Sequence, residues 1–286
     1  MNLILRDLLA VQDGIGLCWL GNLGWLIRAG GRLVAFDLDL DRPVAGPIPG
    51  PAPSDTPGGP VASTLNRGGG PVRRLRPSPV PTADLAPVLD VVFITHEHGD
   101  HFGEATARIL AERSRCAFVV PASCVARARA FGIPESRLTV ARPRQPFSIA
   151  GIPVEPQRAL HGHTRQSVYR GANLDDCGYV LTLGGRKLFQ PGDSVLLQDH
   201  LEDLTGVSIL FVSPTEHNTH IAPSRTLVEA INPDFVFPQH FGTYLPTDQN
   251  RFWTVGYPDE LRASLAPELQ QRFHTLEQGQ LFHIAP

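Results

Sequence analysis

The sequence is poor in cysteine, lysine and long apolar runs, and each shortage narrows what the protein can be. Its four cysteines are Cys18, Cys116, Cys124 and Cys177. None forms a Cys-x-x-Cys pair, so the pattern favours free thiols in a reducing cytoplasm over a disulfide framework. No apolar run approaches the ~20 residues of a transmembrane helix, and Leu3-Ile4-Leu5 is too short for the core of a signal peptide. We expect a cytoplasmic protein without stable membrane insertion.

The chain also has little net charge. Its 286 residues carry a formal charge of −3, with 42% apolar and 19% charged residues, and Lys187 is the only lysine. Nucleic-acid binders usually present a basic face, so this composition speaks against a nucleic-acid partner. It suits a globular protein that acts on a small-molecule substrate, whether as a monomer or as a homo-oligomer.

One segment has no helical or strand periodicity. Residues 43–81 hold eleven of the 27 prolines and seven of the 27 glycines. Such a stretch cannot bury enough apolar surface to offset its ordering entropy. It is either a surface insertion or, since long loops are often functional, a lid or wall over a site. Three arginines near its end could meet an anionic substrate or face solvent: Arg73, Arg74 and Arg76.

Elsewhere short apolar runs alternate with helical patterns. Residues 17–20, 25–27 and 33–36 read as strands that are separated by turn signals. Residues 104–113 and 223–231 read as helices, short strands are expected near Phe273 and Leu281, and no element is predicted for residues 1–12. Strands followed by β-α-β units occur in both halves of the chain. This order predicts two sheets packed face to face, with helices outside.

The densest group of possible metal ligands follows one of these strands. The apolar run Val91–Ile94 precedes Thr95-His96-Glu97-His98-Gly99-Asp100-His101. A strand that ends in this way delivers three imidazoles and a carboxylate to one point at the edge of a sheet. Imidazole and carboxylate ligands suit zinc, iron or manganese. The motif therefore predicts a metal site.

Further His and Asp residues follow other apolar runs. They are Asp37, His161 and His163 in Leu160-His161-Gly162-His163, Asp193 in Phe-Gln-Pro-Gly-Asp-Ser, and His240. Taken singly each is weak, because Asp193 alone would more often cap a turn and a lone histidine is often structural. Loops at strand ends on one edge of an α/β fold are, however, where ligands usually bind. The order and spacing of all the clusters together indicate one shared site.

That order resembles the metallo-β-lactamase-fold hydrolases, from Leu20-Gly21 to about Tyr244. Within them the chain is similar to the branch that contains ascorbate-6-phosphate lactonase and N-acyl-phosphatidylethanolamine phospholipase D. The similarity rests on Gly70-Pro71-Val72-Arg73 before the metal motif and on His240-Phe241-Gly242-Thr243. The resemblance implies an α/β protein with a four-layer αββα sandwich of two mixed sheets. It implies a single domain over residues 1–286, with residues 43–81 as an insertion.

The resemblance also implies a role for each residue of the site. One metal ion would be held by His96, His98 and His161, and a second by Asp100, His101 and His240. Asp193 would bridge the two ions, with Asp100 and Asp193 also serving catalysis. Asp37 would orient ligands without touching metal, and His163 would support the pocket. Zinc is the expected metal, with manganese and iron as alternatives for the same ligands.

The segment Pro214–His220 departs from the family pattern because it holds two extra histidines, His217 and His220. It follows the apolar run 208–212, so it should approach the same edge of the sheet. Histidine titrates near neutrality, so these side chains could recognise substrate or protonate a leaving group. The alternative is a hydrated loop. We place His217 and His220 among the catalytic candidates.

These residues predict a dinuclear metal-dependent hydrolase in which a metal-bridging hydroxide attacks a small-molecule ester, lactone or amide. No G-x-S-x-G elbow is present, which excludes the commonest serine hydrolase design. A phosphodiesterase acting on a lipid headgroup or nucleotide is the alternative, and it should place arginines beside the metals. The candidates are Arg73, Arg74, Arg76 and Arg165. A binding protein of this fold that has lost activity is the third possibility.

Overall fold

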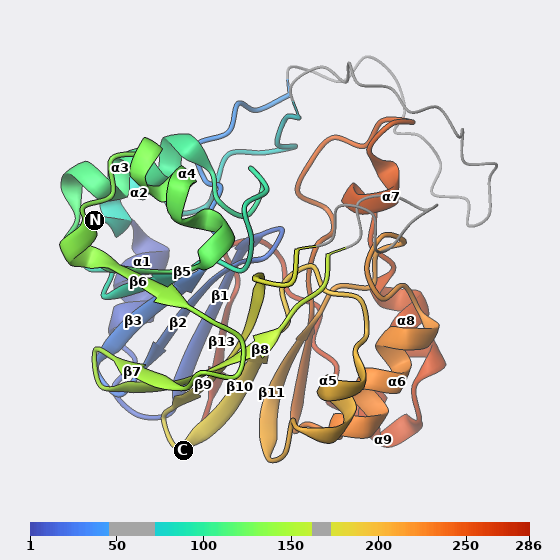
Figure 1. Cartoon of the computed structure of the whole chain (residues 1–286). Helices are drawn as coiled ribbons and strands as arrows, with labels where there is room; N and C mark the ends of the chain where they lie inside the picture. Colours follow the sequence, from blue (N-terminus) through green and yellow to red (C-terminus); the bar gives the residue numbers. More distant parts are fainter. Residues whose placement is uncertain (46–71, 162–172) are drawn as a thin grey trace.

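The computed structural model describes residues 1–45, 72–161 and 173–286, and these form two stacked β-sheets (Figure 1). The first sheet has the strand order β13-β1-β2-β3-β4-β5-β6 and the second β12-β11-β10-β9-β8-β7. The strands of the first sheet are β1 (Ile15–Gly21), β2 (Gly24–Ala29), β3 (Arg32–Phe36), β4 (Val91–Phe93), β5 (Ala117–Pro121), β6 (Leu138–Ala141) and β13 (Leu281–Ile284). Those of the second are β7 (Phe147–Ile149), β8 (Ile152–Arg158), β9 (Cys177–Leu183), β10 (Arg186–Gln190), β11 (Val207–Val212) and β12 (Phe235–Pro238).

Helices cover the outer face of each sheet, as Figure 1 shows. On the first sheet lie α1 (Leu3–Leu9), α2 (Thr82–Leu85), α3 (Glu104–Arg113) and α4 (Val125–Ala130). On the second lie α5 (Gln198–Glu202), α6 (Ala222–Ile231), α8 (Pro258–Ser264) and α9 (Pro267–Gln271). The short helix α7 (Arg251–Thr254) stands apart from both layers, and the 3₁₀ turns η1 (Ala122–Cys124) and η2 (Glu135–Arg137) flank α4. The expected four-layer αββα sandwich is confirmed.

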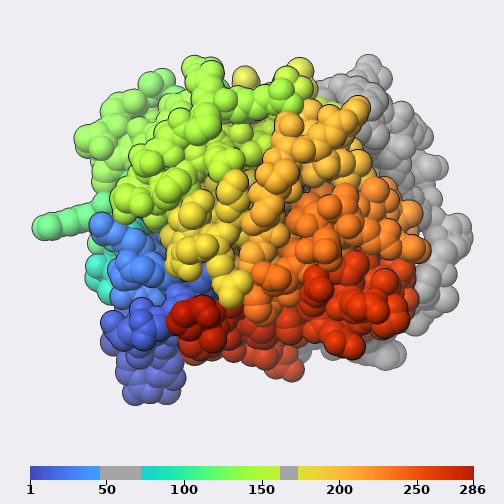
Figure 2. All heavy atoms as spheres, turned by 90° about the horizontal axis from the view of Figure 1, so that it is seen from below, coloured from blue at the N-terminus to red at the C-terminus, as the bar shows by residue number. Residues whose placement is uncertain are grey.

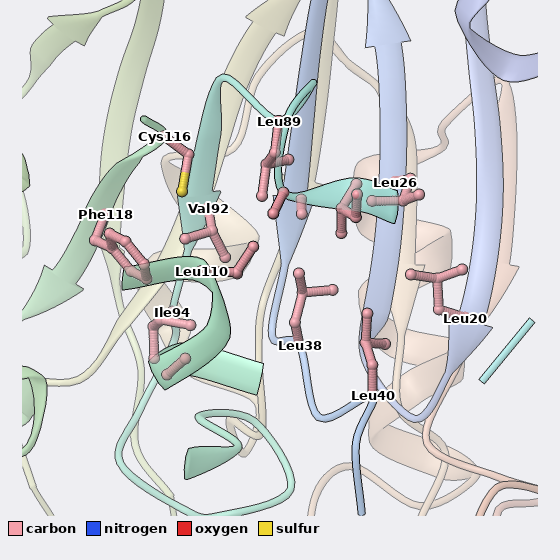
Figure 3. Close-up of a cluster of buried hydrophobic side chains, with 14 of the residues drawn as sticks. Leu20, Leu26, Leu38, Leu40, Leu89, Val92, Ile94, Leu110, Cys116 and Phe118 are labelled. Atoms are coloured by element: carbon pink, nitrogen blue, oxygen red, sulfur yellow. The ribbon is translucent and has the colours of Figure 1, made fainter. Parts of the chain in front are cut away.

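Three apolar cores hold these layers together. The central core lies between the sheets and includes Trp25 of the first and Phe211 of the second, whose ring centroids are 4.6 Å apart. A second core lies between the first sheet and its helices, where Leu110 of α3 lies near Val92 and Phe118 (Figure 3). A third lies between the second sheet and its helices. Burial of apolar surface on both faces of each sheet fixes the position of the strand ends.

Strand direction brings several strand ends to one edge. Strands β3 to β6 are parallel, and so are β10, β11 and β12. Strand β8 runs in the direction of β10 because both pair antiparallel with β9. At the opposite end of the chain, β13 pairs antiparallel with β1, so the C-terminal segment lies beside the N-terminal one (Figure 2).

The structure departs from the sequence prediction in two short elements. Residues 3–9 form α1, where the Asn2 side chain caps the helix by accepting a hydrogen bond from Leu5 N, and Leu5 and Leu8 are buried. The strand expected near Phe273 is only a single bridge to Val236. None of the helices described is long and apolar enough to cross a membrane.

The ends of the proline-rich segment are tied to the fold. Backbone hydrogen bonds join Arg74 to Pro43 and Ala45, and Leu75 to Thr243. Residues 46–71 lie outside the described part of the chain, so the choice between lid and surface insertion stays open.

The Arg74 side chain is only 1% exposed, and it donates hydrogen bonds of 2.7 Å to the carbonyl oxygens of Asp39 and Leu20. Arg74 is therefore a structural residue, and its prediction as a substrate-binding residue is wrong.

We predict that all four cysteines are inert in the native protein. Each is buried and forms no disulfide, and burial raises the pKa of Cys18 and of Cys177 to about 12. Because the thiolate is the reactive form, a thiol reagent at pH 8 should label no cysteine within minutes, and all four after denaturation. Mass spectrometry of the labelled chain checks this. Rapid labelling of one native thiol would contradict it.

Candidate metal centre

The predicted ligands follow strands whose carboxyl ends meet at one edge of the molecule. His96, His98, Asp100 and His101 follow β4, and Asp37 follows β3. From the second sheet, His161 follows β8, Asp193 follows β10, His217 follows β11 and His240 follows β12. Asp37 and His240 adopt positive φ values of 42° and 65°. Such backbone strain in non-glycine residues persists only where the surrounding structure enforces it.

The carboxylate of Asp193 is the meeting point of the site. Its Oδ2 atom lies 2.9 Å from Nε2 of His217 and 3.0 Å from Nε2 of His240. The same oxygen lies 3.3 Å from Nε2 of His101 and 3.4 Å from Nε2 of His161. Four imidazoles from four separate loops therefore surround one carboxylate oxygen.

Two groups of three side chains near Asp193 have ligand atoms within 4.8 Å of one another. One group is His96, His98 and His161, and the other is Asp100, His101 and His240. These are the two ligand sets that the family resemblance implies. Two further groups meet the same criterion and include Asp193: His96, His101 and Asp193, and His161, Asp193 and His217. The structure thus brings together every predicted metal ligand.

The residues fit a metal ion. Nε2 of His101 is buried and makes no hydrogen bond to any residue that the structure describes, although it faces Asp100 and Asp193 at 3.5 and 3.3 Å. A buried polar atom without a partner is costly, and a cation would satisfy it. Imidazole nitrogens and carboxylate oxygens are a donor set that zinc, manganese and iron accept.

Hydrogen bonds around the cluster set which ring nitrogens face inward. Asp37 accepts from Thr95 N at 2.8 Å, from Thr95 Oγ1 at 2.7 Å and from His101 Nδ1 at 2.9 Å. Since a carboxylate can only accept, Nδ1 of His101 carries a proton, and its Nε2 faces Asp100 and Asp193. Thr95 Oγ1 also lies 3.1 Å from Nδ1 of His96. This is the placement expected for Asp37.

A buried pair of amides behind the site was missed by sequence reasoning. Gln239 donates to Gln190 Oε1 at 2.6 Å, and Gln190 donates back to Gln239 Oε1 at 2.9 Å. Gly192 N and Trp25 Nε1 also donate to this pair. Gln190 is the last residue of β10 and Gln239 directly follows β12, each just before a ligand loop, and this position was the available sequence signal. The pair joins the Asp193 loop to the start of the His240 loop.

Two asparagines, also missed from the sequence, hold the carboxylates. Asn22 Nδ2 lies 3.1 Å from Asp100 Oδ2, and Asn218 Nδ2 lies 2.9 Å from Asp193 Oδ1. Each donates one hydrogen bond to its carboxylate and so fixes the orientation of that group, and Asn22 donates a second one to the carbonyl oxygen of Asp100. Asn218 follows His217 in the segment that the sequence marked as a departure from the family.

The electrostatics of the site favour the ionised form of Asp100 and Asp193 and the neutral form of His96, His98 and His217. Burial alone would raise the pKa of Asp193, but His240 and His101 hold it well below its usual range. Burial, together with neighbouring His161, lowers the pKa of His98 to about 4, and burial lowers that of His217. His101 is the exception: although burial opposes it, surrounding carboxylates raise its pKa well above the usual value. Neutral imidazole and ionised carboxylate are the forms that bind metal.

A cavity of about 330 Å³ opens onto this cluster. Its described lining consists of Arg42, Val72, His98, Gly99, Asp100, His161, Asp193, His217, Phe252 and Trp253. Arg42 and the two aromatic side chains were not predicted from the sequence.

Not every predicted substrate or catalytic residue reaches this cavity. The exposed Arg73 and Arg76 do not line it. Exposed His220 does not line it either, and packs its ring edge-on against Tyr257 at 5.1 Å. The prediction of His220 as a catalytic residue is therefore not supported by its position. His163 and Arg165 lie outside the described residues.

Several known proteins are similar to this chain in sequence or in fold. A UPF0173 metal-dependent hydrolase from Thermococcus onnurineus is 29% identical over 161 residues, which are 55% of this chain and 69% of the relative. An isothiocyanate hydrolase from Delia radicum gut bacteria shares the fold with a TM-score of 0.69 at 18% identity, covering 95% of this chain and 100% of that one. A metallo hydrolase from Ignicoccus hospitalis gives 0.65 at 15% identity, with the same two coverages.

The family model described as the beta-lactamase superfamily domain matches residues 60–241, which is more than half of the chain. That span contains every predicted metal ligand. The chain therefore belongs to the beta-lactamase superfamily domain family, and it carries groups of His and Asp residues that could hold metal.

Proposed function

We propose that the protein is a metal-dependent hydrolase that holds two divalent ions and cleaves a small-molecule ester, lactone or amide. One observation carries the proposal: two groups of three ligands lie near Asp193, whose Oδ2 is within 3.4 Å of four imidazoles. The Thermococcus relative is called a metal-dependent hydrolase, which supports the same activity here.

Each residue of the site has a part in this proposal. His96, His98 and His161 would hold one ion, Asp100, His101 and His240 the other, and Asp193 both. Two such ions would polarise the scissile bond and lower the pKa of a water to about 7, which supplies hydroxide at neutral pH. Asp37 keeps Nδ1 of His101 protonated, and Asn218 keeps the Asp193 carboxylate in position.

His217 is our candidate for proton transfer. Its Nδ1 lies 3.0 Å from Thr215 Oγ1, and its Nε2 lies 2.9 Å from Asp193 Oδ2. Because the carboxylate can only accept, His217 holds its proton at Nε2, and its side chain lines the cavity. Burial lowers its pKa, so the ring is neutral at pH 7 and acts first as a base: it would take a proton from the attacking water and then, as imidazolium, pass that proton to the leaving oxygen or nitrogen.

Phosphodiester hydrolysis is the second candidate, and Arg42 is the observation in its favour. Of the arginines predicted for this role, Arg74 is buried and neither Arg73 nor Arg76 lines the cavity. Arg42 does line it, but Val72, Phe252 and Trp253 form an apolar wall beside it. We favour an ester or lactone because this wall suits the apolar part of an organic substrate. The sequence resemblance to the branch that contains ascorbate-6-phosphate lactonase points to the same substrate class.

The proposal is tested by metal analysis followed by a substrate panel. Purified protein reloaded separately with zinc, manganese or iron should hold about two ions per chain. It should hydrolyse lactones or esters faster than phosphodiesters or amides. Chelation should lower the rate by about a thousandfold or more, because metal ions contribute several kcal/mol of transition-state stabilisation. A chain that binds no metal but still folds would instead support the inactive binding protein.

A further inference from the structure

We propose that Arg42 binds an anionic group of the substrate, a carboxylate or a phosphate, and so makes acidic small molecules the preferred substrate class. The inference rests on the proposed hydrolase function and deepens it. It begins from the position of Arg42, whose side chain lines the metal cavity together with Gly99 and Trp253. Among the described residues, Arg42 is the only arginine or lysine in that lining.

One nitrogen of the Arg42 guanidinium, Nε, is anchored by the carboxylate of Asp39. This nitrogen donates a very short hydrogen bond to Oδ2 of Asp39, a side chain that is only 7% exposed. The same oxygen accepts from Tyr244 Oη at 2.9 Å, and Arg74 donates to the Asp39 carbonyl oxygen at 2.7 Å. The guanidinium lies 5.6 Å from the centroid of the Tyr244 ring. This network fixes the guanidinium before any ligand arrives, which reduces the entropy cost of binding.

The two terminal nitrogens of Arg42 remain available. In residues 1–45, 72–161 and 173–286 no hydrogen bond to Nη1 or Nη2 is formed. The side chain is 22% exposed, so this half of the guanidinium is neither fully hydrated nor paired. A fork of two N–H donors matches the two oxygens of a carboxylate or phosphate. An acid group on the substrate would complete it.

The open end of Arg42 lies beside the metal ligands. A Cβ atom on Gly99 would be 3.3 Å from Nη2 of Arg42, and Gly99 stands between His98 and Asp100. An acid held by Arg42 therefore lies beside the loop that carries the ligands His98 and Asp100. Phe252, Trp253 and Val72 then contact the apolar body. The resulting substrate is a small acid with an apolar or aromatic part.

Three esters that differ in one group test the inference. 4-Acetoxybenzoate carries a carboxylate, 4-acetoxyphenyl phosphate a phosphate, and 4-acetoxybenzamide neither. Wild-type protein should have a higher kcat/KM for at least one anionic ester than for the amide. In Arg42→Gln that kcat/KM should fall about 10- to 100-fold, mainly through KM, because hydrogen bonds to charged groups contribute about 1.5–3 kcal/mol. The rate of ester hydrolysis for the neutral 4-acetoxybenzamide should change by less than about threefold.

Two further variants separate recognition from folding. Arg225→Gln removes an exposed arginine that pairs with Glu229 on α6, and it should change none of the three rates. Arg42→Lys keeps a cation beside Asp39 but loses the fork, so it should fold normally and recover only part of the preference. Equal preference for acidic esters in wild type and Arg42→Gln would overturn the proposal, and so would wild type showing no preference.

Equilibrium binding tests Arg42 without turnover. Calorimetric titration of the metal-loaded protein with benzoate should give a Kd about tenfold or more lower than that of Arg42→Gln, and benzamide should bind both proteins equally weakly. If no ester is hydrolysed but benzoate binding still depends on Arg42, the proposed function fails and the anion site stands. If esters are hydrolysed and benzoate binding is the same in both proteins, the proposal for Arg42 is wrong and the proposed hydrolase function stands.

Discussion

Replacement of His98 or of Asp193 by alanine should lower kcat/KM by about a thousandfold or more while the protein remains folded. His98 belongs to one group of ligands only, whereas Asp193 contacts both. Loss of His98 should therefore reduce metal content by about one ion per chain, and loss of Asp193 should weaken both sites. Several kcal/mol of transition-state stabilisation disappear with the metal ions, which corresponds to this loss of rate.

The fold should survive because the ligands lie beyond the strand ends. None of them belongs to the three apolar cores that join the sheets and helices. Circular dichroism and thermal melting should show native secondary structure in both variants, and mass spectrometry of metals should show the loss. His283→Ala is the control, because His283 is exposed and contacts Asp13 O at the opposite end of the chain. Undiminished turnover in His98→Ala or Asp193→Ala would overturn the ligand assignment.

The ligand positions could be predicted from the sequence because they have a strong local signal. Polar residues that directly follow short apolar runs stand out, and parallel strands bring such positions to one edge. Asp37 and the His96–His101 motif follow β3 and β4 in this way, and His240 follows β12. The same reasoning gave the layer order, since β-α-β units admit few arrangements.

Residues that act through burial or through distant contacts could not be predicted. Arg73, Arg74 and Arg76 look alike in the sequence, and only packing shows that Arg74 is enclosed while the other two are exposed. Arg42 enters the cavity because Asp39 and Tyr244 hold it, and Tyr244 lies some two hundred residues away. The helix α1 was missed although Asn2 is a typical N-cap residue, because its apolar and charged residues alternate irregularly.

Replacement of Gly192 by alanine should also cause a large loss of stability and activity, because the backbone conformation at this position and its surroundings both require glycine. Its φ is +65°, and a Cβ atom there would lie 2.7 Å from Cβ of Thr95 and 2.8 Å from Thr95 Oγ1. That hydroxyl donates to Asp37 and contacts His96, while Gly192 itself precedes Asp193. Gly192→Ala should therefore displace ligands of both sheets at once.

We expect Gly192→Ala to lower the free energy of unfolding by about 2–4 kcal/mol, from about 1–2 kcal/mol of left-handed strain plus overpacking. It should also lower kcat/KM about a hundredfold or more, because small displacements of catalytic groups have effects of this size. Gly185→Ala is the matched control: its φ is +77° but a Cβ there meets nothing within 4 Å. The free energy of unfolding of Gly185→Ala should fall only by the about 1–2 kcal/mol of left-handed strain, and this variant should keep full activity and metal content. Denaturant unfolding, metal analysis and kinetics compare the two variants. If both lose the same stability and neither loses activity, the contact with Thr95 does not position the site.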